Sequence, residues 1–191
     1  MTWRVVADAW PELTARWRAN WPGCAPVAHE LKHYDAARWV RFHSLPNAKR
    51  HADTPAEYDI LLNRHNTVLT TLFADEDLYV VTATHTSDGE ITDLFTHPEP
   101  VTLNLGARPW LTLTRDDGYS HLLATRRRPR PRGLDPLLRA VADAVLRDVL
   151  ITDLRMRRIY HPYDGGADCI LENTEARRLL ETVHADWLPA G

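Results

Sequence analysis

The chain has 191 residues, a mass of 21.9 kDa and a formal net charge of −3, with 44% hydrophobic and 26% charged residues. This length can bury a hydrophobic core without disulfide or metal support, so we expect one globular domain over residues 1–191. The slightly acidic balance excludes a general electrostatic attraction to nucleic acid or anionic membranes, and no apolar run is long enough for a membrane helix.

Periodic apolar residues and capping signals predict about four helices. The clearest start is at Thr54, where Pro55 and Glu57 complete a capping box at the first helical turn. The helices are expected over 11–20, 54–73, 135–147 and from 174 onward.

Short segments rich in β-branched and aromatic residues predict strands between these helices. We expect them over 37–45, 77–85, 110–114, 119–125, 149–152, 158–163 and 167–171, with a turn at 87–89. Because strands cluster between the helices rather than alternate with them, the fold class is α+β. The expected architecture is a single two-layer domain with a mostly antiparallel sheet of about six to eight strands and about four helices.

On the second predicted helix, His65 lies at the centre of the apolar stripe, and Arg64 and Asn66 lie on its two margins. The stripe directs a titratable ring toward the sheet, where an imidazole needs a hydrogen-bond partner. The alternative to a functional role is that His65 is a core residue whose hydrogen bonds are satisfied within the protein. Arg64 and Asn66 are placed to reach polar groups at the edge of the buried layer.

Arg41 and His43 alternate with apolar residues on the first strand, so their side chains leave the same sheet face about 7 Å apart. This spacing suits a two-point grip on phosphate or carboxylate, to which Lys49 and Arg50 add charge. The alternative is a solvated outer face. If the second helix packs on the opposite face, both side chains point away from His65.

The segment from His161 to Asp168 predicts a hairpin whose register decides its chemistry. If Asp164 and Gly165 occupy the centre of the turn, His161 lies opposite Asp168, and the carboxylate can orient an imidazole base. If the turn is centred one residue later, Asp168 faces Tyr163 instead. Both registers are compatible with the sequence.

His29-Glu30-Leu31-Lys32-His33 spells the zinc-protease motif, in which two histidines bind zinc and the glutamate activates water. With ten histidines in the chain, a chance match is unsurprising, and the available helix is short. We therefore expect no metal. Phosphate-cradling glycine loops and paired-cysteine motifs are absent, so no cofactor is expected either.

The arginine-rich segment 126–132 could contact RNA, but it lacks interleaved aromatic residues. The acidic overall charge favours a solvated loop, and we expect no nucleic-acid partner. The N-terminal segment does not have the pattern of a signal peptide, and two cysteines are too few for a disulfide framework. A cytoplasmic protein is expected.

Several polar segments together resemble the bacterial domain-of-unknown-function 3885 family, from about Trp21 onward. They are Arg41–Pro46, Lys49-Arg50, Arg64–Asn66, Tyr163-Asp164 with Asp168, and His184–Trp187. The resemblance implies no particular activity, substrate or catalytic residue. A second histidine at position 33 is not part of the family pattern, which further disfavours the zinc site. Small acidic α+β domains are also similar to immunity proteins found beside bacterial toxins.

Two functions are compatible with these residues. The first is a binding or accessory protein, similar to immunity proteins, that holds a small anionic ligand or an acidic protein partner. Its ligand-binding residues are Arg41, Lys49, Arg50, Arg64, Asn66 and Tyr163. The second is an enzyme acting on a phosphate- or carboxylate-bearing substrate through acid–base chemistry. Its catalytic candidates are His43, His65, His161, Asp164 and Asp168. A zinc hydrolase through His29, Glu30 and His33 is the minor alternative.

Overall fold

The computed structural model describes residues 3–5, 9–87, 102–128 and 130–189. The strands are β1 (Trp3–Val5), β2 (Trp39–His43), β3 (Leu78–Thr86), β4 (Arg108–Arg115), β5 (Gly118–Arg127), β6 (Leu150–Asp153), β7 (Ile159–Tyr163) and β8 (Gly166–Ile170). The α-helices are α1 (Pro11–Asn20), α2 (Leu31–Tyr34), α3 (Pro55–Phe73), α5 (Asp135–Ala142) and α6 (Thr174–Val183). Short 3₁₀ turns lie at Ala28–Glu30, Pro46–Ala48 and Ala185–Trp187.

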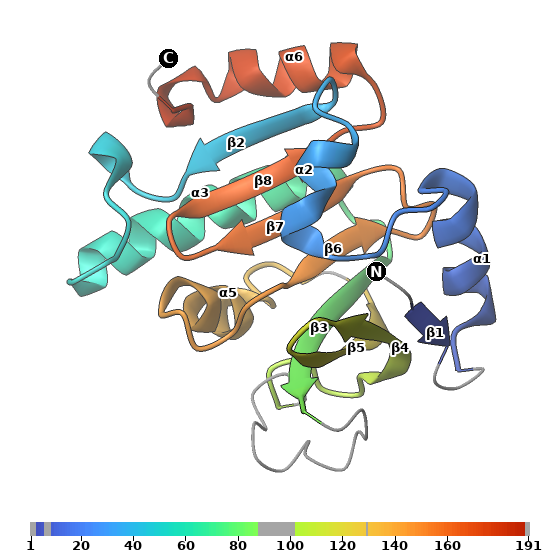
Figure 1. The fold of residues 1–191 in the computed structure, drawn as a ribbon. Coiled ribbons are helices and arrows are strands. Elements are labelled where there is room, and N and C mark those ends of the chain that lie inside the picture. Colours follow the sequence, from blue (N-terminus) through green and yellow to red (C-terminus); the bar gives the residue numbers. More distant parts are fainter. Residues whose placement is uncertain (1–2, 6–8, 88–101, 129, 190–191) are drawn as a thin grey trace.

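The strands form one open antiparallel sheet in the order β1-β4-β5-β3-β6-β7-β8-β2. Figure 1 shows the C-terminal hairpin β7-β8 beside β2, far from the β4-β5 hairpin along the sheet. The predicted α+β class and antiparallel sheet are confirmed. The 28–30 turn and α2 lie near β8, which brings the early segment close to the C-terminal hairpin.

The α3 helix begins as the sequence predicts, with both hydrogen bonds of the capping box between Thr54 and Glu57 present. Its buried stripe packs on the face of the sheet that carries Val40 and Phe42. Since residues on a strand alternate between faces, Arg41 and His43 point to the other face. The sequence left this relationship open, and the packing of α3 decides it.

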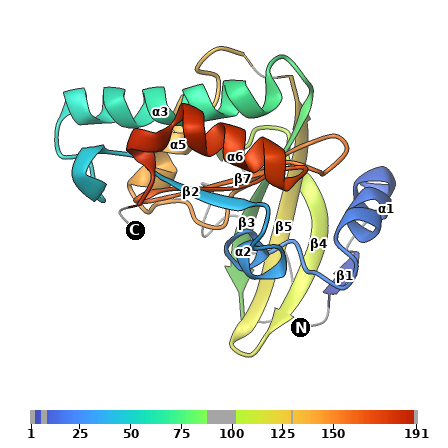
Figure 2. The same cartoon turned by 90° about the horizontal axis from the view of Figure 1, so that it is seen from above.

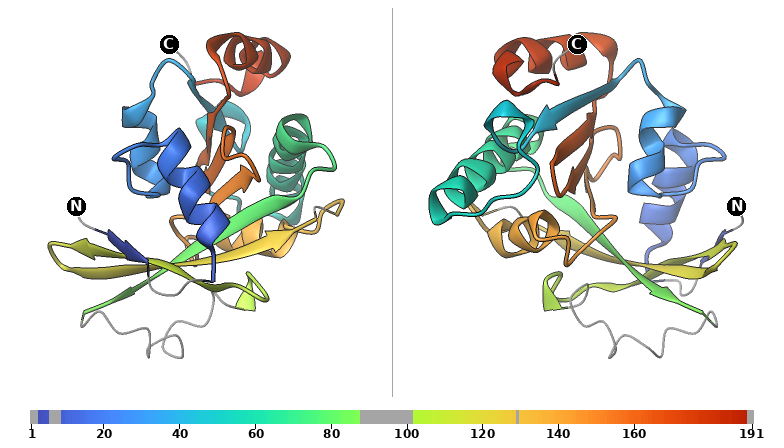
Figure 3. Two further views of the ribbon diagram at one scale, coloured as in Figure 1. Left: turned by 90° about the vertical axis from the view of Figure 1, so that its right-hand side faces the viewer. Right: turned by 60° about the vertical axis from the view of Figure 1, so that its left-hand side comes forward.

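Each face of the sheet has a separate apolar core. One core joins β2, β7 and β8 to α3, α5 and α6, and the other joins the opposite face of β3, β4 and β6 to α1 and α2. Figures 2 and 3 show these two groups of helices on opposite sides of the sheet. The helices therefore cover both faces, where the sequence predicts a single helical layer.

Most predicted elements lie within a few residues of the observed ones, with two clear differences. The α5 helix ends at Ala142 rather than near Arg147, because the chain turns through the left-handed region at Ala144. The sequence did not indicate β1. Most of the predicted turn at 87–89 lies outside the described residues.

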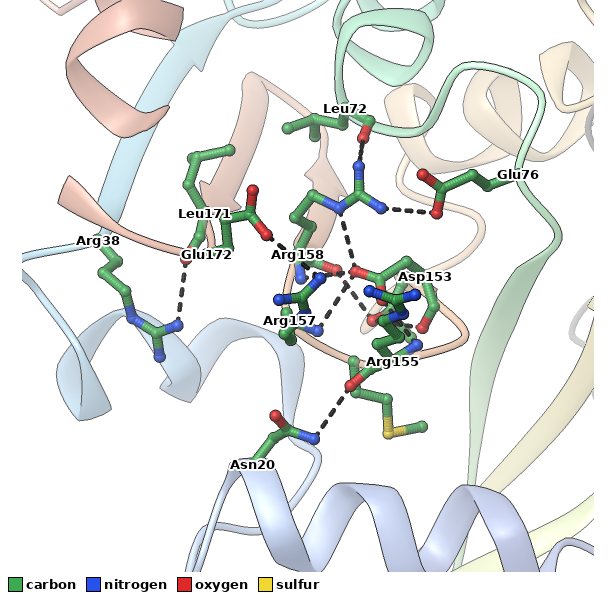
Figure 4. A network of polar contacts seen from close by, with 12 residues as sticks. Asn20, Arg38, Leu72, Glu76, Asp153, Arg155, Arg157, Arg158, Leu171 and Glu172 are labelled. Atoms are coloured by element: carbon green, nitrogen blue, oxygen red, sulfur yellow. Dashed lines mark hydrogen bonds and ion pairs between the residues drawn. The ribbon is translucent and has the colours of Figure 1, made fainter. Parts of the chain in front are cut away.

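The turn between β6 and β7 is built around one buried carboxylate, shown in Figure 4. Asp153, which is 1% exposed, accepts hydrogen bonds from the backbone N–H groups of Arg155, Arg157 and Arg158. The Arg158 guanidinium reaches the same carboxylate and also binds the Leu72 carbonyl. This network joins the end of α3 to the β6-β7 turn.

Within the described helices, none is long and apolar enough to cross a membrane.

Candidate functional site

A row of polar residues crosses β2, β8 and β7 on the face away from α3. Arg41 lies opposite Asp168, and Asp168 lies opposite His161. Tyr163 pairs with Gly166, so the turn is centred on Asp164 and Gly165. Of the two registers compatible with the sequence, the structure has the one that places His161 across from Asp168.

The carboxylate of Asp168 is bound to Arg41 rather than to His161. Arg41 Nε lies 2.7 Å from Asp168 Oδ1, and its Nη2 lies 2.9 Å from Oδ2. The guanidinium also lies over the rings of Trp39 and Tyr163, at 5.3 and 5.2 Å from their centroids. Arg41 is thus engaged on three sides and is poorly placed to grip a ligand.

The two cations of the following loop are also paired with carboxylates. Arg50 contacts Asp164 at 2.7 Å. Lys49 contacts Asp53 and Glu57, and Glu57 closes the capping box of α3. An anion that used Lys49 would compete with these two carboxylates.

Arg64 and Asn66 have structural partners as well. Arg64 donates to the backbone carbonyl of His43 and lies over the ring of Trp187. Asn66 donates to Asp135 Oδ1 at 2.7 Å, which joins α3 to the start of α5. These residues reach polar groups at the margin of the buried layer, as their helical positions predict.

His65 lies in a buried network with Ser44 and Tyr160. Its Nδ1 lies 2.5 Å from the Tyr160 hydroxyl, and its Nε2 lies 3.1 Å from Ser44 Oγ. Burial lowers the pKa of His65 to about 4, so the ring is neutral and carries one proton. Within the part of the chain that the structure describes, the Tyr160 hydroxyl has no other acceptor and donates to Nδ1.

This tautomer leaves the Nε2–H of His65 to donate to Ser44. The imidazole therefore cannot accept the Ser44 proton, which a serine nucleophile would require. The adjoining cavity, lined by His43, Arg64 and Trp187 among others, has a volume of only 10 Å³, close to that of one water molecule. Neither the tautomer nor the space favours a catalytic role for His65.

The three candidate histidines do not all meet at one site, since His43 and His65 border the 10 Å³ cavity and His161 borders another one. His65 faces the α3 side of the sheet, whereas His43 and His161 belong to strand positions on the opposite face. Of the three, only His161 lines a cavity large enough for a small molecule. The candidate site is therefore smaller than the set of residues proposed from sequence.

A polar cavity of 280 Å³ lies between the 3₁₀ turn before α2, the segment after α5 and the β7-β8 hairpin. Its charged and titratable lining consists of His29, Arg50, Arg147, Asp148, His161 and Asp164. Tyr163 also borders it, and burial, with Asp168 nearby, raises the pKa of its hydroxyl. Four of the ligand-binding and acid–base candidates thus contribute to one concave site, together with His29 of the zinc motif.

The tautomer of His161 follows from its only hydrogen-bond partner in the described chain. Its Nδ1 lies 2.8 Å from the Val149 carbonyl oxygen, which can only accept, so Nδ1 carries the proton. Burial lowers the pKa of His161, and the neutral ring keeps a lone pair on Nε2. His161 lines the cavity and keeps a proton acceptor on its ring, which is oriented by a backbone carbonyl rather than by Asp168.

His29 has the opposite electrostatic environment. Its Nδ1 lies 2.6 Å from Asp148 Oδ1, and this hydrogen bond raises the pKa of His29. Burial alone would raise the pKa of Asp148, but the hydrogen bond and charge of His29 lower it. The His29–Asp148 pair therefore favours a protonated His29, at the same cavity as the neutral imidazole of His161.

The zinc alternative gains no support from this geometry. His29 belongs to the 3₁₀ turn and binds Asp148, while His33 lies in the four-residue α2 and is exposed. Among the residues that the structure places, no group of three or more histidine, cysteine or acidic side chains could hold a metal ion.

Residues 27–190 match the family model described as Domain of unknown function (DUF3885). The chain belongs to this family. The match confirms the resemblance seen in the sequence, and it includes every residue that lines the polar cavity. No curated protein and no solved structure matches the chain.

Two residues of the DUF3885 cavity carried no recognisable signal in the sequence. Arg147 and Asp148 lie in the irregular segment after α5, where Asp148 adopts a positive φ of 53°. Asp148 meets His29 across 119 positions of the chain. Only the positive φ, which aspartate tolerates better than most residues, links the identity of Asp148 to its local structure.

Proposed function

We propose that the protein binds a small anionic ligand in the cavity between His29, Arg147 and His161. The observation that carries this proposal is the charge balance of the lining. Arg50 is paired with Asp164 and His29 with Asp148, whereas Arg147 forms no hydrogen bond or ion pair with any residue that the structure describes. One positive charge is left for a ligand.

The remaining lining gives the site both a donor and an acceptor. Arg147 and the protonated His29 donate hydrogen bonds to an anion, and His161 Nε2 accepts one from a hydroxyl group or water. Small-molecule sites combine a concave shape with a few convergent polar groups of this kind. This arrangement favours a compact ligand with a phosphate or carboxylate group.

An acidic protein partner is less well supported. The cations that would form its docking surface, Arg41, Lys49 and Arg50, are each paired with a carboxylate of the same chain. A partner carboxylate would have to displace one that is already close by, at little net gain. We therefore retain the small ligand as the proposed function.

Thermal unfolding in the presence of inorganic phosphate, dimethyl phosphate and acetate tests this function. A ligand at 100 times its Kd stabilises the native state by about 2.7 kcal/mol, which raises Tm. We expect at least one of the three anions to raise Tm, and Arg147→Ala to abolish the increase. Arg108→Ala, at an exposed arginine on β4, is the matched control and keeps the increase. An equal increase in the Arg147→Ala variant would show that the anion binds elsewhere.

A further inference from the structure

We infer that this cavity hydrolyses phosphodiesters, with His161 as the general base and His29 as the general acid. The inference rests on the proposed function, because the anion held beside Arg147 is here the phosphodiester group of the substrate.

The hydrogen bonds of the two imidazoles favour opposite protonation states at the same cavity. The proton on His161 Nδ1 is fixed by the Val149 carbonyl, which leaves Nε2 as the base. The carboxylate of Asp148 lies 2.6 Å from His29 Nδ1 and stabilises the imidazolium form. Pairs of titratable groups whose environments separate their pKa values are the usual acid and base of a catalytic site.

The charge of the lining selects the substrate class. With His29 protonated and His161 neutral, the three cations His29, Arg50 and Arg147 face the two carboxylates Asp148 and Asp164. Glu30 lies 3.8 Å from His29 Nε2 but outside the lining, so one positive charge remains among the lining residues, and it balances the single negative charge of a phosphodiester better than the double charge of a monoester. The lining includes the exposed residues Arg50 and Arg147, so the ester substituents can extend beyond the 280 Å³ of the cavity.

The reaction is balanced by groups already present and by water. His161 Nε2 takes a proton from water as the water oxygen bonds to phosphorus. The bond from phosphorus to the leaving oxygen breaks, and its electron pair stays on that oxygen, which receives the proton of His29. The products are a phosphate monoester and an alcohol. Arg147 stabilises the charge on the non-bridging oxygens.

The predicted pH profile is bell-shaped. His161 must be neutral, so activity falls below its pKa, which burial and the charge of His29 lower against the Val149 hydrogen bond and the charges of Asp168 and Asp148. His29 must be protonated, so activity falls above its pKa, which the hydrogen bond and charge of Asp148 and the charge of Glu30 raise against burial and Arg115. Because the two pKa values move apart, the pH range in which both groups have the required form is wider than for two free imidazoles.

Two substrates separate the roles of the histidines. Bis(4-nitrophenyl) phosphate releases a phenolate that needs no proton, whereas uridine 2′,3′-cyclic phosphate releases an alkoxide that does. We expect His161→Gln to slow the hydrolysis of both by about 100-fold or more. His29→Gln slows the cyclic substrate by a similar factor and the nitrophenyl ester by less than about 10-fold. A purely structural role for His29 would slow both substrates equally, and a purely structural role for His161 would leave the acidic limb of the pH profile in place.

Binding and turnover are measured on the same proteins. Product formation is followed by absorbance and phosphorus NMR, and dimethyl phosphate binding is followed by Tm. If dimethyl phosphate raises Tm but the wild-type chain hydrolyses neither substrate above the buffer rate, the reaction is wrong and the binding function stands. If no anion raises Tm and nothing is hydrolysed, both fail. Hydrolysis that His161→Gln leaves unchanged in a folded variant also overturns the assignment.

Discussion

Arg41 and Asp168 form a two-point ion pair between the edge strand β2 and its neighbour β8, through contacts of 2.7 and 2.9 Å. The carboxylate is 6% exposed, and the guanidinium is 31% exposed beneath the rings of Trp39 and Tyr163. The sequence predicts a ligand-binding arginine and a catalytic aspartate at these positions. In the structure they satisfy each other and join β2 to the sheet.

Removal of Arg41 should therefore destabilise the fold. In Arg41→Ala, Asp168 stays largely buried without its cation, and we expect the free energy of unfolding to fall by about 3 kcal/mol. Chemical denaturation measures this change. The matched control is Arg50→Ala, because Arg50 forms a comparable pair with Asp164 but is 68% exposed. Its cost is expected to be below about 1 kcal/mol. Equal losses in both variants would contradict the buried-pair argument.

Local patterns predict much of this fold because they depend on neighbouring residues. The capping box defines the start of α3, and the apolar stripe correctly places His65 inside. The predicted end of α5 near Arg147 was wrong. The apolar residues Val145 and Leu146 continue the helical pattern of the sequence, although the chain has already turned at Ala144. Apolar periodicity continues through an irregular segment when one of its side chains, here Leu146, still reaches the core.

The candidate site is harder to predict because it joins distant segments. The hairpin turn places His161 and Asp164 by local rules, but the meeting of His29 with Asp148 depends on how α2 and the segment after α5 pack around the sheet. The sequence marks His29 only as part of a metal motif. The sequence therefore indicates His29 but not its partner Asp148, because no local pattern relates positions 29 and 148.

The stability of the protein should depend on pH through His65. The pKa of His65 is about 4 in the folded chain and about 6.5 in the unfolded chain, so the unfolded state binds more protons between these values. Its contribution is complete above pH 6.5 and is lost as the pH falls toward 4, at a total cost of about 3 kcal/mol. Denaturation at a series of pH values measures the slope.

The His65→Gln variant keeps a donor and an acceptor but does not titrate, so we expect a shallower slope in this acidic range. The slope does not vanish, because burial also lowers the pKa values of His161 and His184, with the same sign. The exposed His51, replaced by Gln, is the control. An unchanged slope in His65→Gln would show that the buried ring does not control the acid sensitivity.

The turn between β6 and β7 should be sensitive to loss of its carboxylate. Asp153→Ala removes the acceptor for three backbone N–H groups and for Arg158 Nε, and we expect a loss of about 3 kcal/mol. Asp117→Ala, in the exposed turn between β4 and β5, should change stability by less than about 0.5 kcal/mol. Comparable midpoints for the two variants in urea would refute the role assigned to Asp153.

Adjacent glycines in the β7-β8 hairpin should respond differently to alanine. A Cβ atom at Gly166 would lie 2.1 Å from the backbone oxygen of Phe42, so β2 would have to move away from β8. At Gly165 the nearest atom is Cγ of Arg50 at 3.3 Å, and this flexible side chain can shift. We expect Gly166→Ala to cost about 3 kcal/mol or more, and Gly165→Ala about 1 kcal/mol or less.

Hydrogen exchange of the β2 amides distinguishes local separation of the strand from a general loss of stability. In Gly166→Ala, protection should fall most at β2, because the clash is with the backbone of that strand and not with a side chain. The central strands β3 and β5 are paired on both sides and should keep their protection relative to global unfolding. If Gly165→Ala were the more damaging variant, β2 would not approach Gly166 as closely as the structure places it.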